Sequence, residues 1–294
     1  MNNYFFIIQI QENYLCSYKS IDLNNASDSI YASYYAGKCF NDIKNLKNVG
    51  YILLNEHKKV IVAKGNIIDA DFIFTIGIKQ PNIKTVWDNE LDYMEVKKVL
   101  EPYYKREVGS CRSIGDFLKI KSSRNNDYFI KPHYKNKKGM KSKHIIPFFI
   151  PKEIHTMDEL RKYANYEEIF NYLVYDPPIE YSVKDDIFTR GEEYRVIIAN
   201  NHLHSIQRYP QQDIIDRGGE VLQEAYLTVH NKLKENFNLE RTVVSFDIVK
   251  KDKEWKLVEF HLKCNFLGHY HKTNQNDFIK YIECFENYSK YTEL

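Results

Sequence analysis

The sequence predicts an α+β protein, in which short strands and amphipathic helices are mixed along one chain. Runs of β-branched and aromatic residues that end at polar or glycine positions predict the strands, and residues 4–10 and 72–76 are two of them. Residues 26–46 place apolar side chains at helical spacing, which predicts a helix. Residues 243–270 predict two strands joined by a charged turn at residues 250–254. Strands and helices in this arrangement indicate the α+β class.

Composition limits the classes of protein that this chain can represent. With 294 residues, 43% of them hydrophobic and 28% charged, the chain can form two domains with ordinary cores. A formal net charge of +2 gives no support to nucleic-acid binding through overall charge. The five cysteines form no CxxC pair and are odd in number, so we expect reduced thiols and a cytoplasmic location. No apolar run approaches the roughly 18 residues of a membrane-spanning helix, so no membrane partner is expected.

The first part of the chain, residues 1–105, predicts a small mixed α/β domain. After the first strand and helix, short strands are expected at residues 51–54 and 60–63. Residues 90–104 predict a helix that links this domain to a second one, residues 106–294. Neither a GxGxxG nor a Walker A sequence occurs here, so the first domain offers no phosphate-binding loop of its own.

A basic loop between two predicted strands stands near the start of the second domain. Residues 127–132 end in Lys131 and Pro132, and residues 145–150 predict the return strand. The lysines of the loop are Lys135, Lys137, Lys138, Lys141 and Lys143. Such a loop can close over polyphosphate, because cationic side chains and backbone N–H groups replace water around anionic oxygens. The alternative is a solvated, lysine-rich hairpin tip.

Three connecting elements follow this loop. A helix at residues 157–173 begins at a capping box, in which Thr156 is the N-cap and Glu159 follows three residues later. Residues 179–183 predict an extended segment, and residues 214–237 predict an amphipathic helix that leads to the final hairpin.

Two arginines lie on a predicted pair of strands between these helices. The strand at residues 193–199 places Glu193 and Arg195 on one face, and the strand at residues 203–209 carries Arg208. An arginine on such a strand is often only an edge residue that keeps its charge in solvent. Two arginines on neighbouring strands beside the same hairpin favour a functional role.

The hairpin at residues 243–270 carries two carboxylates, Asp247 and Glu259. Antiparallel strands with a short connection bring such positions together, and two carboxylates can hold a divalent cation through oxygen ligands. The alternative is that both are ordinary polar residues on the solvent face of a hairpin.

Taken in chain order, these segments resemble the ATP-grasp superfamily. No single segment is specific, but five segments in this order are. The EYR and QRY segments look most like the two-arginine-one-lysine clade, which includes predicted RNA-repair ligases and relatives of initiation-factor assembly chaperones. The resemblance covers residues 127–270, about half of the chain. The matching positions are Lys131 in YFIKP, Glu193 and Arg195 in EEYRVII, Arg208 in SIQRY, Asp247 in SFDIV and Glu259 in KLVEFH.

The resemblance implies an ATP-grasp fold of two subdomains that grip ATP, preceded by a small mixed α/β N-terminal domain. It implies ATP and Mg²⁺ as cofactors, with Asp247 and Glu259 holding one or two Mg²⁺ ions that bridge phosphate oxygens. Lys131 would contact the α- and β-phosphates, while Arg195 and Arg208 would face the transferring γ-phosphate or the acceptor. The other nucleotide-binding residues that it implies are Lys138, Lys141, Lys143 and Glu193.

One position departs from the family pattern, which has Glu-x-Asn at the metal end of the hairpin. This chain has Glu259-Phe260-His261, and its next asparagine is Asn265. Three alternatives stay open: His261 replaces the second metal ligand, Asn265 reaches in from the following loop, or a metal and its activity are lost. Imidazole suits softer metals than Mg²⁺, so a transition-metal site that includes His261, His269 and His271 is a further alternative. Structural histidines are the simpler interpretation for His269 and His271.

The resemblance therefore predicts an ATP-dependent ligase that acts through an acyl phosphate on an unknown carboxylate substrate. An amine or another nucleophile would be the acceptor, and a peptide or protein substrate is compatible with this chemistry. One alternative is an RNA repair or ligation enzyme with RNA as a partner, suggested by the clade and the basic loop. Another is a nucleotide-binding assembly factor with little turnover, suggested by His261. Fold alone does not decide among them.

Overall fold

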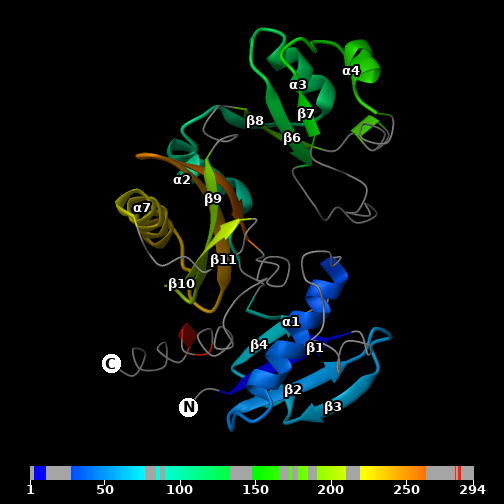
Figure 1. Ribbon diagram of the computed structural model, residues 1–294, viewed down its shortest axis with the longest axis vertical. Helices are drawn as coiled ribbons and strands as arrows, with labels where there is room; N and C mark the ends of the chain where they lie inside the picture. The colour runs from blue at the N-terminus through cyan, green and yellow to red at the C-terminus, as the bar shows by residue number, and fades with distance from the viewer. Residues whose placement is uncertain are drawn as a thin grey trace. The chain divides into compact units, whose positions relative to one another are not determined.

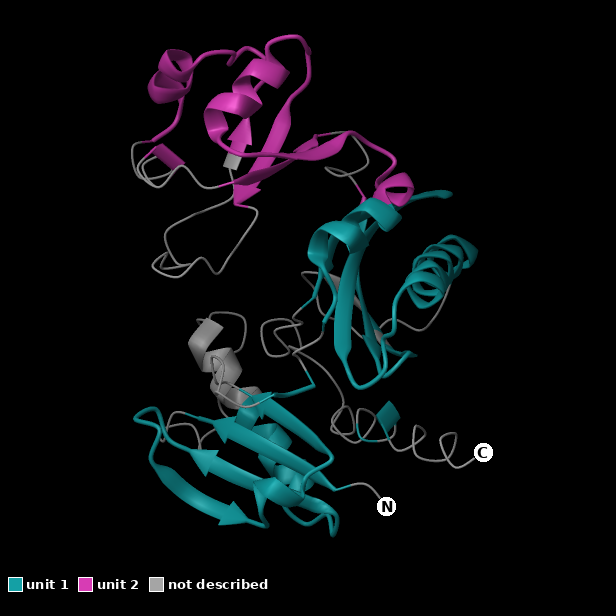
Figure 2. Ribbon diagram, turned by 180° about the vertical axis from the view of Figure 1, so that it is seen from behind, with its two compact units in different colours: residues 1–100, 192–294 teal, residues 101–191 magenta. Residues whose placement is uncertain are grey.

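The computed structural model of the chain contains two compact units (Figure 1). Residues 1–100 and 192–294 form the first unit, and residues 101–191 form the second (Figure 2). The predicted domain division at residue 105 stays a prediction. No helix in the described part of the chain is both long and apolar enough to cross a membrane. The structure describes residues 3–10, 28–76, 84–86, 90–132, 148–165, 172–173, 178–184, 191–209, 219–262, 282 and 284–285.

The first unit begins with a four-stranded sheet in the order β3-β2-β1-β4. Strand β1 runs parallel to β2 and to β4, whereas β3 runs antiparallel to β2. A parallel pair needs a crossover connection, and helix α1 lies between β1 and β2 in the chain and contacts β1. This sheet and helix form the small mixed α/β region that the sequence predicts. The elements are β1 (Tyr4–Gln9), α1 (Asp28–Ile43), β2 (Val49–Leu54), β3 (Val60–Lys64) and β4 (Phe72–Ile76).

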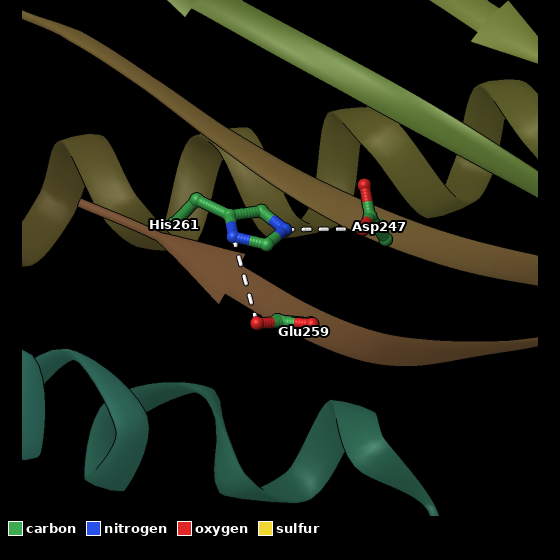
Figure 3. A group of neighbouring side chains, drawn as sticks. All are labelled: Asp247, Glu259 and His261. Atoms are coloured by element: carbon green, nitrogen blue, oxygen red, sulfur yellow. Dashed lines mark hydrogen bonds and ion pairs between the residues drawn. The ribbon is translucent and has the colours of Figure 1, made fainter. Parts of the chain in front are cut away.

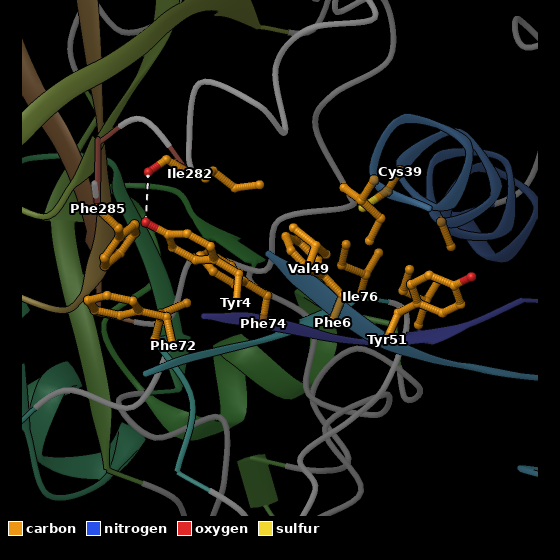
Figure 4. Packing of buried hydrophobic residues seen from close by; sticks show 14 of the residues in the cluster. Tyr4, Phe6, Cys39, Val49, Tyr51, Phe72, Phe74, Ile76, Ile282 and Phe285 are labelled. Carbon is orange, nitrogen blue, oxygen red and sulfur yellow. Dashed lines mark hydrogen bonds between the residues drawn. The ribbon is translucent and has the colours of Figure 1, made fainter. Parts of the chain in front are cut away.

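The hydrophobic core of the first unit joins this sheet to a second sheet (Figure 4). Tyr4, Phe6 and Ile8 point to one face of β1 and are buried in this core. Phe6 stacks on Phe74 with the ring centroids 4.8 Å apart. The Tyr4 hydroxyl donates a hydrogen bond to the carbonyl oxygen of Ile282 at 3.4 Å. The members of the same cluster that come from later in the chain are Ile197, Ala199, Val243, Ile282 and Phe285.

The second sheet is antiparallel throughout and has the order β10-β9-β11-β12. Asn200 and Asn201 both have positive φ angles, 48° and 65°, as a two-residue hairpin turn between β9 and β10 requires. Only Asp252 and Lys253 separate β11 from β12, so the predicted turn at residues 250–254 is too long. The strands are β9 (Glu192–Ala199), β10 (His202–Tyr209), β11 (Val243–Lys251) and β12 (Glu254–His261).

Helix α7 (Glu220–Asn236) covers one face of the second sheet (Figure 1). Trp255 of β12 is the cross-strand partner of Lys250, and its Nε1 donates to Glu224 of α7 at 3.4 Å. Even-numbered residues of β11 therefore face α7, because side chains alternate along a strand. Odd-numbered residues face the other side, where Val243 enters the shared core and Asp247 lies further along the strand.

The second unit is built on an antiparallel sheet in the order β5-β8-β6-β7. Its core includes Phe117, Tyr128, Ile130 and Ile179, each fully buried. Helix α2 (Tyr93–Tyr104) spans the boundary between the units along the chain. The other elements are β5 (Val108–Cys111), α3 (Ile114–Lys121), β6 (Tyr128–Pro132), β7 (Phe148–Ile150), α4 (Met157–Tyr163) and β8 (Ile179–Val183).

Two elements of the second unit differ from the predictions. The helix predicted over residues 157–173 ends at Tyr163, because Ala164 adopts an extended backbone with φ −87° and ψ 145°. Its predicted capping box is confirmed: the Thr156 hydroxyl accepts from the N–H of Glu159, and the Glu159 carboxylate accepts from the N–H of Thr156. Strand β5 was not predicted, since its sequence VGSC has no alternation of apolar and polar residues.

Candidate functional site

Polar side chains gather on the face of the second sheet that is turned away from α7. Arg195 of β9 is the cross-strand partner of Asp247 on β11, which is in turn the partner of Glu259 on β12. Cross-strand partners lie on the same face, so these three residues form a row across the sheet. His261 stands two residues after Glu259 and shares that face. Strand register thus brings together four of the predicted site residues.

The pair of Arg195 and Asp247 is buried and bidentate. Nε of Arg195 donates to Oδ1 of Asp247 at 2.7 Å, and Nη2 donates to Oδ2 at 2.6 Å. Asp247 is only 3% exposed, so the alternative of a solvent-facing polar residue is wrong for this position. Burial by itself would raise the pKa of Asp247, but hydrogen bonds from Arg195 and His261 outweigh it and hold that pKa below its usual value. Asp247 is therefore ionised at neutral pH.

The ring of His261 lies between two carboxylates (Figure 3). Its Nε2 is 3.1 Å from Oδ2 of Asp247 and 3.1 Å from Nη2 of Arg195. Its Nδ1 is 3.5 Å from Oε1 of Glu259. Asp247, Glu259 and His261 each offer one ligand atom, and these atoms lie within 4.8 Å of one another. Two carboxylates and an imidazole in so compact a group can hold a divalent cation.

Glu193 lies on the same face of β9, two residues before Arg195, as the sequence predicts. Burial raises the pKa of Glu193 to about 7, the charges of Asp247 and Glu259 act in the same direction, and the charge of Arg195 opposes them. This carboxyl therefore exchanges its proton near neutral pH, a property that is common at functional sites.

Ser245 adds a buried hydroxyl to this face of the sheet. It is the cross-strand partner of His261, stands two residues before Asp247, and is 1% exposed. Within the described part of the chain, its Oγ has no hydrogen-bond partner. A buried hydroxyl without a partner costs roughly 1–3 kcal/mol, which an ion-bound water or a ligand oxygen would remove. The donor set and this hydroxyl together fit a divalent metal at the cluster.

Lys131 lies in the second unit, near the end of β6. It is the cross-strand partner of Glu180 on β8, and its Nζ is 3.9 Å from Oε2 of Glu180. The Lys131 side chain is 20% exposed and that of Glu180 is 6% exposed. A cation positioned by a buried carboxylate, yet still partly accessible, is suited to contact an anionic ligand.

Several predicted site residues lie outside the described part of the chain. They are the loop lysines Lys138, Lys141 and Lys143, together with Asn265, His269 and His271. For Arg208 the structure describes the backbone alone, which pairs with Tyr194 in the β9–β10 ladder. Ser245 and Glu180 were missed from the sequence. The two-residue spacing from Ser245 to Asp247 could have indicated the first, whereas Glu180 depends on the register of β8 against β6.

Solved structures show what the fold of this chain is similar to. The D-alanine–D-alanine ligase from Bacillus anthracis has a TM-score of 0.54 and 13% identity over 99% of both chains. The D-cycloserine synthetase DcsG has a TM-score of 0.56 and 8% identity over 97% of this chain and 99% of that chain. N5-carboxyaminoimidazole synthetase from Staphylococcus aureus has a TM-score of 0.53 and 11% identity over 97% of this chain and 77% of that chain. No protein-family model and no curated protein matches the sequence.

These similarities concern the fold, since identity in them does not exceed 13%. The three structures share the ATP-grasp architecture, and each alignment spans nearly all of this chain. They confirm the α+β class and the fold that was predicted from residues 127–270, and they leave the clade a prediction. The chain therefore has the ATP-grasp fold.

Proposed function

We propose that this protein is an ATP-dependent ligase of the ATP-grasp type. One observation carries the proposal: the carboxylates of Asp247 and Glu259 face each other with His261 on adjacent strands of a chain that has this fold. Two of the similar structures, the Bacillus anthracis ligase and the Staphylococcus aureus synthetase, are described as complexes with ATP and ADP respectively. A nucleotide is accordingly the ligand that we propose for this chain.

We assign the nucleotide-site roles as follows. Asp247, Glu259 and His261 would hold the divalent cation, which the fold implies to be Mg²⁺, with Asn265 as the further candidate from the sequence. When bound, the cation would neutralise charge on the phosphate oxygens. Lys131 would contact the α- and β-phosphates, where its partial exposure and the fixed Glu180 support the role.

The remaining assignments concern phosphate transfer and the loop. Arg195 and Arg208 are proposed to face the transferring phosphate or the acceptor, and the ion pair with Asp247 fixes the Arg195 guanidinium in place. Glu193 is proposed to lie on the nucleotide side of the same face. The loop lysines Lys138, Lys141 and Lys143 keep their predicted role over the β- and γ-phosphates.

The proposed reaction has two steps. A carboxylate oxygen of the substrate attacks the γ-phosphorus of ATP, the bond to the β–γ bridging oxygen breaks, and ADP leaves. An amine or another nucleophile then attacks the acyl carbon and gives up a proton to solvent, and inorganic phosphate leaves with the bonding electrons. Phosphoryl transfer depends on positioning and charge neutralisation more than on covalent chemistry by the protein, and fixed cations and carboxylates supply both.

Calorimetry with ATP and Mg²⁺ tests the nucleotide site. We expect Mg²⁺-dependent ATP binding that weakens by about tenfold or more in Lys131→Ala and Glu259→Gln, since each removes a charged contact worth roughly 1.5–3 kcal/mol. Lys119→Ala and Glu254→Gln are matched controls, because both residues are exposed and stand in α3 and at the start of β12. Absence of ATP binding, or equal binding by all five proteins, would rule out this proposal.

Product analysis separates the ligase from the other two predicted functions. Conversion of ATP to ADP and phosphate with a carboxylate and an amine supports the acyl-phosphate ligase. Formation of AMP and pyrophosphate with nicked RNA, together with RNA binding that weakens steeply with salt, would support an RNA ligase instead. Nucleotide binding without either product would support an assembly factor.

A further inference from the structure

His261 is the residue at which this chain departs from the Glu-x-Asn pattern, and its two ring nitrogens face different partners. Nε2 approaches Oδ2 of Asp247 at 3.1 Å, and Nδ1 approaches Oε1 of Glu259 at 3.5 Å. A neutral imidazole carries one N–H donor and one acceptor nitrogen. When one ring nitrogen carries the proton and donates it to a neighbouring group, the other nitrogen keeps a lone pair that can accept a hydrogen bond or bind a metal.

Asp247 and Arg195 both approach Nε2 of His261. Oδ2 of Asp247 lies 3.1 Å from Nε2 and accepts from Nη2 of Arg195 at 2.6 Å, while the same Nη2 lies 3.1 Å from Nε2. An ionised carboxylate only accepts and a guanidinium only donates, so these two neighbours favour different tautomers. The tautomer that can bind a metal through Nδ1 carries the ring proton on Nε2, which then donates to Asp247. The lone pair of Nδ1 then points toward the Glu259 side of the ring. Carboxylate-to-histidine hydrogen bonds of this kind commonly orient a histidine that binds a metal through its other nitrogen.

The separation of Nδ1 and Glu259 suits a shared ion. Zinc makes bonds of about 2.0–2.2 Å to histidine nitrogen and carboxylate oxygen, and bonds of this length from one ion place the two ligand atoms roughly 3–3.5 Å apart. The observed distance between Nδ1 of His261 and Oε1 of Glu259 is 3.5 Å. The Glu259 side chain is 25% exposed and that of His261 is 17% exposed, so an ion can reach the pair from solvent.

Ser245 is a second, independent sign of a ligand at this position. It is 1% exposed, it is the cross-strand partner of His261, and its hydroxyl has no hydrogen-bond partner among the described residues. Buried hydroxyl groups are normally satisfied. A water bound to an ion beside His261 would satisfy this one.

We propose that Glu259 and Nδ1 of His261 bind a divalent first-row transition metal, with Mn²⁺ as the fitting ion, in preference to Mg²⁺. Imidazole favours transition metals, whereas carboxylate and phosphate oxygens suit Mn²⁺ and Mg²⁺ alike, so Mn²⁺ matches the whole donor set. In place of the ligand role assigned to it under the proposed function, Asp247 then acts as a positioning residue that is hydrogen-bonded to Nε2. The inference rests on the proposed function in that the ion would be the one that accompanies the nucleotide.

Electron spin echo spectroscopy of Mn²⁺ added to the full chain tests this inference directly. We expect modulation from a histidine ¹⁴N nucleus that changes frequency when the protein is made with ¹⁵N-labelled histidine, which requires no substitution. We also expect Mn²⁺ to bind at least about tenfold more tightly than Mg²⁺ in competition. His261→Asn should abolish the nitrogen modulation and lower this preference. His57→Asn is the matched control, since the His57 side chain is 73% exposed.

Bound Mn²⁺ without histidine nitrogen coupling would overturn the inference, as would equal affinity for Mn²⁺ and Mg²⁺. Calorimetry with ATP on the same samples separates this result from the proposed function. Mg²⁺-dependent ATP binding without nitrogen coupling refutes the metal assignment and leaves the ligase proposal standing. Nitrogen coupling without any ATP binding supports the metal assignment and refutes the ligase proposal.

Discussion

At the scale of single residues, the pair of Arg195 and Asp247 places two opposite charges in a buried position. Both residues are less than a tenth exposed, at 9% and 3%. Removing two charges from water is costly, and only good geometry and further hydrogen bonds compensate for it. The bidentate contact and the approach of His261 to Asp247 provide them. The pair therefore keeps the Asp247 carboxylate ionised beside the candidate metal ligands Glu259 and His261.

We predict that Arg195→Ala lowers the free energy of unfolding by about 3–5 kcal/mol, because it leaves Asp247 buried without its main partner. Urea-induced unfolding measures the change. Lys232→Ala is the control: Lys232 and Glu235 form an exposed pair on α7, and its loss should cost less than about 1 kcal/mol. An effect of Arg195→Ala no larger than that of the control would contradict the prediction.

At the scale of secondary-structure elements, close backbone approach in the first sheet depends on Gly50. A Cβ atom on this residue of β2 would lie 2.6 Å from a ring carbon of Phe5 and 3.0 Å from the carbonyl oxygen of Lys64. Phe5 is 1% exposed, so its ring has little room to move. By contrast, a Cβ atom on Gly37 in helix α1 would have no neighbour within 4 Å.

These two glycines should respond in opposite directions to the same substitution. Gly50→Ala is expected to destabilise the protein by about 1–3 kcal/mol through overpacking. Gly37→Ala is expected to stabilise it by about 0.5–1 kcal/mol, because alanine loses less backbone entropy in a helix. Thermal unfolding of both variants provides the measurement. A stabilising Gly50→Ala would show that Phe5 and the β2–β3 ladder can move apart.

Helix α7 carries a pH-dependent contact with the β9–β10 turn. His230 is 8% exposed, and its Nε2 lies 2.9 Å from the carbonyl oxygen of Asn201. Burial lowers the pKa of His230 below its ordinary value of 6.5, although the contact with Asn201 acts the other way. As the pH falls, the unfolded chain therefore binds this proton before the folded chain does.

The resulting contribution to stability is complete above pH 6.5 and is lost as the pH falls toward the folded-state pKa. We predict a smaller loss of thermal stability between pH 8 and pH 5 in His230→Gln than in the unsubstituted protein, because glutamine can donate to Asn201 and does not titrate. His57→Gln, at a side chain that is 73% exposed and is not among the charges that act on His230, should behave like the unsubstituted protein. Identical pH profiles for all three proteins would show that His230 does not contribute.

At the scale of the whole molecule, each compact unit has its own hydrophobic cluster. A ligand that binds only the folded chain stabilises it by mass action. On the proposed function, ATP with a divalent cation at a hundred times its Kd should raise the free energy of unfolding by about 2.7 kcal/mol. Thermal shift with ATP, compared with ATP plus a chelator, measures this effect. An unchanged midpoint for the unsubstituted protein would count against a nucleotide site.

Local sequence patterns predicted much of the fold. The apolar run at residues 4–10 and the capping box at Thr156 are short-range signals for a strand and for a helix start, and the structure contains both. Strand β5 and the early end of helix α4 escaped prediction. Pairing with β8 makes a strand of the sequence VGSC, and this pairing joins residues far apart in the chain.

For the candidate site, the sequence by itself determined which residue types are available and in what order, including the carboxylates of Asp247 and Glu259 and the departure at His261. Only the tertiary structure decided their electrostatic state. The register of β9 against β11 places Arg195 on Asp247, and the register of β12 places His261 between two carboxylates with Ser245 beside it. Charge and burial depend on distances between residues that are distant in the chain, and these distances exist only once the strands have paired.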